Sequence, residues 1–240
     1  MKNNPIIVAL DTDDVKWAQK LSHQLADHVG GFKIGPRFTL RADKSFIKDL
    51  SQLGILFFDH KFFDIPSTTL ASVNVAFELG AQWVSVHALN GRDCLAELSL
   101  LESQIKKNND GFRILAVTVL TSFNRNDLPP VWKDESIEES VQSLTSLAFS
   151  SGIKTIVCSP EEIKTIKSKY PESFLVVPGI RTVESNNADQ KRVATPLKAL
   201  QDGASALVIG RPIFENSNPA EAAKKIYDSL KDFTGKDFTG

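Results

Sequence analysis

The segment "FFDHKFFDIPSTT" at residues 57–69 places three charged side chains, Asp59, Lys61 and Asp64, in an aromatic, apolar stretch. Asp59 and Lys61 are two positions apart, so on a β-strand their side chains point to the same face. Asp64 precedes Pro66, which ends a strand, so we expect Asp64 on the following loop. Carboxylates near a lysine keep its ammonium group charged. An ammonium group fixed in this way can stabilise negative charge that develops during a reaction.

A solvated salt bridge at the end of a strand is the alternative interpretation of the same residues. Further polar residues stand at the ends of other apolar segments: Asp11, Lys33, His87, Thr121 and Arg211. Burial of an ion costs several kcal/mol unless the ion is paired. Convergence of Lys33 with the charges of segment 57–69 therefore indicates a site. His87 is also compatible with a hydrogen-bonded core histidine, and His60 is expected to face away from the site.

Two glycine–arginine pairs are candidates for phosphate binding. "ALVIGRPIFE" places Gly210 at the end of the last apolar segment, followed by Arg211, and "VPGIR" places Gly179 and Arg181 at the end of the one before it. Backbone N–H groups and a cation at such positions are suited to a phosphate. Glycines that only form tight turns are the alternative.

A polar segment with little periodicity, "TVESNNADQKRVAT", follows Arg181 at residues 182–195. Loops between strands and helices in barrels usually have two to six residues, so this one is long. We expect a lid over the ligand, with Gln190 able to reach it. A surface loop without a role is the alternative.

Short apolar segments alternate with longer amphipathic ones along the chain. The expected strands are residues 6–10, 31–35, 55–62, 83–89, 113–120, 155–159, 174–180 and 206–210. The expected helices are residues 13–29, 37–53, 66–79, 92–107, 136–150, 160–169, 196–202 and 219–232. Eight such units favour an α/β protein with a closed (β/α)8 TIM barrel, whose ligands bind where the strands end. We expect one domain over residues 1–232 and a loose tail over 233–240.

The composition excludes several classes of protein. The formal net charge is −1, so there is no basic excess to attract nucleic acid. No apolar run approaches the ~20 residues that span a bilayer, and the N-terminus lacks the apolar core of a signal peptide. Cys94 and Cys158 have no metal-ligand spacing. Free thiols and a cytoplasmic location are the expectation.

Taken together, these motifs resemble the bacterial orotidine 5′-phosphate decarboxylase family. "DHKFFDIPST" fits its D-x-K-x-x-D-I-P-x-T signature, and "FKIG", "AVTVLTS", "VPGIR", "DQKR" and "IGRP" follow the expected order. The resemblance covers nearly the whole chain, from "VALD" to "VIGRPI". His60 and Phe63 depart from the pattern, which has Leu and His there, but neither is a catalytic position.

The resemblance implies a role for each charged residue of the site. Asp11 and Lys33 would bind the ribose hydroxyls, with Lys33 also bridging to Asp59. Asp59 would lie beside the substrate carboxylate, and Lys61 would deliver a proton to C6 of the pyrimidine. Asp64 would act in catalysis from across a dimer interface.

The resemblance also implies the remaining contacts of orotidine 5′-phosphate. Thr68 would cross the same interface of a homodimer, and Thr121 and Ser122 would lie at the pyrimidine. The phosphate would be bound by the residues of the glycine–arginine pairs and the lid: Arg181, Gln190, Gly210 and Arg211. The family uses neither a metal nor an organic cofactor.

Two other functions are compatible with the sequence. A magnesium-dependent decarboxylase of 3-keto-sugar phosphates shares the D-x-K-x-x-D element and stabilises an enediolate through its metal. A sensor of nucleotide phosphates could keep the fold without catalysis. The intact set of Lys33, Asp59, Lys61 and Asp64 argues against the sensor.

Overall fold

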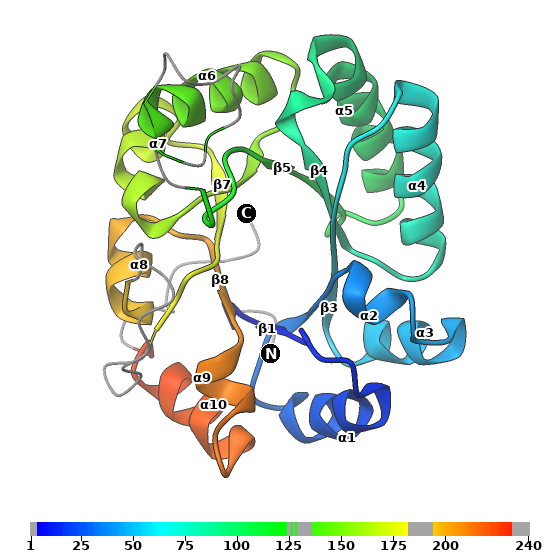
Figure 1. Cartoon of the computed structure of the whole chain (residues 1–240), viewed down its shortest axis with the longest axis vertical. Coiled ribbons are helices and arrows are strands. Elements are labelled where there is room, and N and C mark those ends of the chain that lie inside the picture. The colour runs from blue at the N-terminus through cyan, green and yellow to red at the C-terminus, as the bar shows by residue number, and fades with distance from the viewer. Residues whose placement is uncertain (1–3, 124–125, 127, 129–135, 182–193, 232–240) are drawn as a thin grey trace.

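The structure is a computed structural model, and it describes residues 4–123, 126, 128, 136–181 and 194–231. Eight parallel strands form one closed barrel in chain order, surrounded by helices (Figure 1). The strands are β1 (Ile6–Ala9), β2 (Gly31–Ile34), β3 (Ile55–Phe62), β4 (Trp83–His87), β5 (Arg113–Val117), β6 (Thr155–Val157), β7 (Phe174–Val177) and β8 (Ala206–Ile209). The predicted (β/α)8 fold is confirmed.

The helices return the chain from each strand to the next. They are α1 (Val15–Leu25), α2 (Pro36–Thr39), α3 (Lys44–Gln52), α4 (Pro66–Glu78), α5 (Arg92–Lys106), α6 (Ile137–Ser150), α7 (Ile163–Lys169), α8 (Pro196–Asp202), α9 (Arg211–Phe214) and α10 (Pro219–Asp228). Two 3₁₀ turns, η1 (Ala88–Asn90) and η3 (Pro160–Glu162), precede α5 and α7. The expected tail at 233–240 lies outside the described residues.

The helix predicted over residues 37–53 is wrong, because the chain forms α2 and α3 there instead. Asp43 has an extended backbone conformation between them, and its carboxylate accepts a hydrogen bond from the N–H of Phe46. Asp43 is therefore the N-cap of a new helix.

Most strands end one to three residues before the predicted boundary, and β3 alone reaches it. Beyond these ends the chain leaves the hydrogen-bonded ladder and forms the loops at the carboxyl-terminal mouth of the barrel. The residues that sequence patterns assigned to strand ends, such as Gly179 and Gly210, therefore lie in these loops.

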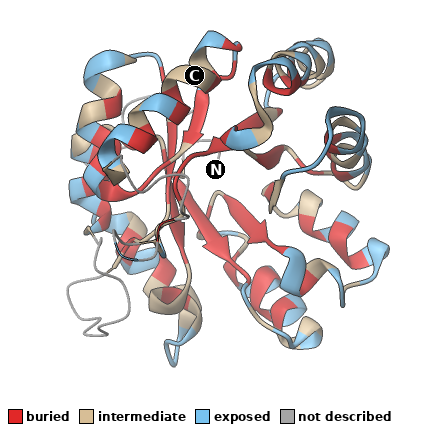
Figure 2. Ribbon diagram, turned by 45° about the horizontal axis from the view of Figure 1, so that its top comes forward, coloured by how far each residue is buried: buried red, intermediate tan, exposed pale blue. Residues whose placement is uncertain are grey.

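The core has two parts, because alternate strand residues face the helices and the barrel interior. The large part lies between strands and helices (Figure 2). The interior of the barrel is filled by a smaller apolar cluster: Ile7, Ala9, Phe57, Trp83, Leu115, Val176, Ala206 and Val208. Trp83 is central, with its ring 6.1 Å from Phe57 and 5.6 Å from Phe174 in edge-on contacts. These side chains occupy the interior of the barrel below its mouth.

Candidate active site

A cavity of about 600 Å³ opens at the carboxyl-terminal ends of the strands. Most of the predicted site residues line it: Asp11, Lys33, Asp59, Lys61, Thr121, Gly179, Arg181, Gly210 and Arg211. They come from the ends of six different strands, so the closed barrel brings distant parts of the sequence to one place. Ser122 lies at the turn beyond Thr121, where it is exposed and outside the cavity lining.

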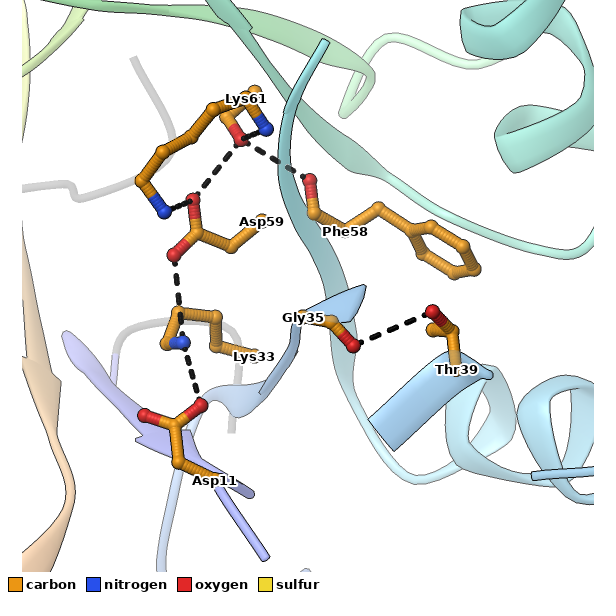
Figure 3. A network of polar contacts seen from close by, with 8 residues as sticks. Asp11, Lys33, Gly35, Thr39, Phe58, Asp59 and Lys61 are labelled. Atoms are coloured by element: carbon orange, nitrogen blue, oxygen red, sulfur yellow. Dashed lines mark hydrogen bonds and ion pairs between the residues drawn. The ribbon is translucent and has the colours of Figure 1, made fainter. Parts of the chain in front are cut away.

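Four charged side chains form a continuous network on one side of this cavity (Figure 3). The Lys33 ammonium lies 2.9 Å from Asp11 Oδ1 and 3.4 Å from Asp59 Oδ2. The other oxygen of the Asp59 carboxylate accepts a hydrogen bond from Lys61 Nζ at 2.9 Å. The charges thus alternate from Asp11 through Lys33 and Asp59 to Lys61.

The centre of the network is buried and stays ionised. Burial alone would raise the pKa of Asp59, but Lys33 and Lys61 outweigh it and keep the pKa below its ordinary value. Burial would likewise lower the pKa of Lys33, yet Asp59 and Asp11 raise it. The Lys61 side chain is 36% exposed, against 13% for Asp59 and 11% for Lys33. Lys61 therefore presents the network to the cavity.

The backbone of β3 is distorted where it carries these residues. Lys61 has a φ of 50°, and the pairing of β3 with β4 shifts register between Phe58 and Phe62. Asp59 and Lys61 both reach the cavity, as predicted. His60 faces the opposite side, where its ring stacks on Phe58 and contacts Phe62. The expectation for His60 is confirmed.

Asp64 and Thr68 do not line the cavity of their own chain. Both are exposed, on the loop after β3 and in the first turn of α4. The Asp64 carboxylate accepts a hydrogen bond from the N–H of Ile65 at 2.7 Å. Within the described residues, Asp64 forms no ion pair with Lys61.

The opposite side of the cavity contains the candidate phosphate site. Gly210 directly precedes α9, and an added Cβ there would come within 3.2 Å of the Phe214 ring. Gly179 has a φ of 80°, a conformation that favours glycine. Arg181 and Arg211 also line this side of the cavity.

The ends of the predicted lid are joined at this side. The N–H of Arg181 donates to the carbonyl of Ala194 at 3.0 Å, and Ile180 forms a parallel bridge with Ala194. The chain therefore leaves and re-enters the barrel at the cavity. Gln190 lies outside the described residues.

Two polar residues that sequence reasoning missed support this geometry. Ser85 in β4 accepts a hydrogen bond from the N–H of Lys61 and donates one to Asp59. The Asn90 side-chain amide donates to the carbonyls of Phe62 and His87 at 2.8 and 2.9 Å. Ser85 alternates with apolar residues in "WVSVH", and a lone polar residue in such a strand was the available signal.

His87 has a structural role. Its Nδ1 accepts a hydrogen bond from the N–H of Leu89, and its ring lies 5.9 Å from Phe63. Burial lowers its pKa below the ordinary value. His87 does not line the cavity, so the core-histidine interpretation applies.

The described part of the chain has neither a cluster of three or more His, Cys, Asp or Glu suited to a metal ion, nor a helix long and apolar enough to cross a membrane. A (β/α)8 barrel with a charged network and a candidate phosphate site at its mouth is typical of barrel enzymes that act on phosphorylated substrates.

Comparisons with known proteins show which family within this class the chain belongs to. Residues 4–226 match the model of the orotidine 5′-phosphate decarboxylase / HUMPS family. The chain is 40% identical to the orotidine 5′-phosphate decarboxylase of Dichelobacter nodosus, with 96% of this chain and 100% of that protein covered. The corresponding protein of Sphingopyxis alaskensis is 36% identical, with 95% and 99% covered. The chain belongs to the orotidine 5′-phosphate decarboxylase / HUMPS family.

A solved structure agrees with this assignment. The crystal structure of orotidine 5′-phosphate decarboxylase from Lactobacillus acidophilus matches with a TM-score of 0.81 and 31% sequence identity. The match covers 97% of this chain and 100% of that one.

Proposed function

We propose that this chain is a carbon–carbon lyase that decarboxylates orotidine 5′-phosphate to UMP, the last step of de novo UMP synthesis. The observation that carries the proposal is the network from Asp11 to Lys61, which shares one cavity with the candidate phosphate site. Full-length relatives named for this activity support the substrate.

The two sides of the cavity set the orientation of the nucleotide. The phosphate binds at Gly210 and Arg211, with Arg181 adjacent and Gln190 reaching it from the lid. Asp11 and Lys33 bind the ribose hydroxyls, because they lie between the phosphate side and Asp59. The pyrimidine is then beside Lys61, with Thr121 at its edge and Ser122 on the exposed turn beyond Thr121.

The chemical problem is the electron pair that remains when CO₂ leaves. The C6–carboxylate bond breaks and its electrons stay on C6, in an orbital that cannot delocalise into the ring. Lys61 stabilises this charge as it develops and then transfers a proton from Nζ to C6, which forms the C–H bond of UMP. Water restores the proton on Lys61. No organic cofactor is needed as an electron sink.

Asp59 prepares Lys61 for this step. Its carboxylate fixes the ammonium group before substrate binds, so the cation needs no reorganisation during the reaction. Asp59 would also lie beside the substrate carboxylate, and CO₂ release would relieve the repulsion between the two negative charges. We assign the larger effect to transition-state stabilisation, because a cation already in place gains interaction energy as charge develops on C6.

We further propose that the enzyme is a homodimer in which Asp64 and Thr68 complete the site of the other subunit. Asp64 lies between two exposed apolar side chains, Phe63 at 61% and Ile65 at 64% exposure. Leu89, at 39% exposure, follows the neighbouring strand β4. Cover by a second copy would bury these side chains.

Mixing Asp64→Ala protein with Lys61→Ala protein tests the shared site. Mixed dimers would regain one complete site, so the mixture should be more active than either protein alone. A mixture no more active than the sum of its parts would contradict the exchange of Asp64 between subunits.

The activity itself is tested by incubation with orotidine 5′-phosphate and measurement of UV absorbance. Conversion to UMP that persists with a chelator is expected. Loss of activity with the chelator would favour the magnesium-dependent decarboxylase of 3-keto-sugar phosphates, and binding without turnover would favour the sensor.

We also propose that residues 1–232 form one domain and that the protein is cytoplasmic. The location is supported by Cys94 and Cys158, which are both buried free thiols.

A further inference from the structure

The irregular pairing of β3 with β4 falls at the charged residues of the site. Between Phe58 and Phe62, β3 advances four residues, whereas β4 advances two, from Val84 to Val86. Lys61 lies in this bulge with a φ of 50°, and it is the only non-glycine residue with a positive φ in the described part of the chain. A left-handed backbone is unfavourable for lysine, so surrounding contacts must maintain it.

Ser85 provides the contact that maintains this conformation. Its hydroxyl oxygen accepts a hydrogen bond from the backbone N–H of Lys61 at 2.9 Å. The same hydroxyl donates to Asp59 Oδ1 at 3.0 Å, closer than the alternative acceptor, the Phe58 carbonyl, at 3.5 Å. Ser85 is fully buried, so water does not compete for either bond. The Ser85 hydroxyl thus links the backbone of Lys61 to the Asp59 carboxylate, which also accepts a hydrogen bond from the Lys61 ammonium.

We propose that Ser85 is a positioning residue for the decarboxylation: its two hydrogen bonds fix the left-handed backbone of Lys61 and orient the Asp59 carboxylate toward the Lys61 ammonium. This inference rests on the proposed roles of Lys61 and Asp59. Ser85 is absent from the lining of the cavity, so it acts through these two residues and without contact to the substrate.

The geometry predicts which kinetic constant depends on Ser85. Without the hydroxyl, the Lys61 N–H loses its partner and Asp59 Oδ1 keeps only the lysine, so both groups become less well placed. Misplacement of a reacting group by about 1 Å can slow a reaction by about a hundredfold. The phosphate side of the cavity is built from β7 and β8 and their loops, which Ser85 does not touch. The effect should therefore fall on kcat and not on nucleotide binding.

Three variants test the proposal. Ser85→Ala removes the hydroxyl, and Ser85→Cys removes most of its hydrogen-bonding capacity while still filling the space. Ser22→Ala is the matched control, because Ser22 is also fully buried and its hydroxyl donates to the Gln19 carbonyl within α1, away from the site. For each, kcat and KM are measured with orotidine 5′-phosphate, and the Kd of UMP is measured by calorimetry.

We expect both Ser85 variants to lower kcat by about tenfold to a hundredfold, with KM and the Kd of UMP within about twofold of wild type and Ser22→Ala unchanged. The proposal is overturned if Ser85→Cys keeps wild-type kcat, or if UMP affinity falls in parallel with kcat. The Lys61→Ala variant distinguishes a failure of the proposed mechanism from a failure of the proposed role of Ser85. Wild-type turnover of Lys61→Ala would refute the mechanism. If Lys61→Ala is inactive and Ser85→Cys is fully active, only the role of Ser85 is refuted.

Discussion

The two ends of the barrel both contain a cavity lined by charged residues, but they use charge differently. The cavity at the mouth has about 600 Å³ and the one at the amino-terminal ends of β5 to β8 about 590 Å³. At the amino-terminal end, the Arg113 guanidinium lies 4.1 Å from the centre of the Phe174 ring, and Lys167 Nζ donates to the carbonyls of Pro171 and Ser173. These cations support packing and a loop.

The pKa values of cations at the two ends of the barrel shift in opposite directions. Burial lowers the pKa of Arg113 and of Lys167, and nearby carboxylates do not reverse the effect. At the mouth, Asp59 and Asp11 reverse the effect of burial and raise the pKa of Lys33. A cavity with cations is therefore not by itself a site. What distinguishes the mouth is that its buried lysine, Lys33, lies within 3.4 Å of two carboxylates, which raise its pKa.

The largest expected difference between the ends is in catalysis. Lys61→Ala should lose at least a few hundred-fold in kcat, because removal of one preorganised donor costs about 3–4 kcal/mol in the transition state. Lys167→Ala, at the other end, should keep kcat within about twofold. Turnover is followed by UV absorbance. Equal kcat values for the two variants would remove the functional distinction between the cavities.

Arg211→Ala tests the candidate phosphate side of the mouth, opposite the charged network. Loss of a hydrogen bond to a charged group costs about 1.5–3 kcal/mol, so kcat/KM should fall by roughly tenfold to a hundredfold. We expect part of the loss in kcat, because a phosphate contact at Arg211 would use its binding energy to close the predicted lid and assemble the site. A raised KM with unchanged kcat would show instead that the contact is equally strong in the ground and transition states.

The amino-terminal end should respond in stability. Phe174→Leu removes the ring that contacts Arg113 and Trp83. Loss of these contacts should lower the free energy of unfolding by about 1–2 kcal/mol, with kcat unchanged. Denaturant unfolding and steady-state kinetics measure the two quantities. A kcat that falls with stability preserved would mean that this end also affects the reaction.

The smallest expected effect concerns His60, which lies behind the mouth against the helices. Burial lowers its pKa, although Asp59 opposes this. The unfolded chain then binds more protons than the folded one as pH falls below the unfolded pKa of about 6.5, so His60 reduces stability in acid. His60→Leu should therefore raise Tm relative to wild type more at pH 5.5 than at pH 8. The same Tm difference at both pH values would contradict this.

Sequence patterns predicted the barrel and most of the site because both depend on local signals. Strand alternation placed Asp59 and Lys61 on one face, and glycine–arginine pairs marked the phosphate side. The left-handed backbone of Lys61 was not predictable, because the hydroxyl that bonds to its N–H belongs to Ser85 in another strand. The split between α2 and α3 had a local signal, the N-cap Asp43, which the helical periodicity on either side obscured.

The position of Asp64 shows a second limit of such patterns. Its motif spacing suggested a partner for Lys61, yet in the described chain its carboxylate bonds to the neighbouring backbone N–H. The proposed contact of Asp64 with a second copy of the chain would leave no periodicity in one sequence. The exposed Phe63 and Ile65 beside it are visible only once the fold is known.

The apolar cluster around Trp83 occupies the interior of the barrel and leaves the cavity open at the mouth. Because apolar side chains occupy the interior below Lys61, we expect the CO₂ released at C6 to leave through the mouth and not through the far end of the barrel. Both products, the small neutral molecule and the large anion, must leave by the route through which the substrate entered.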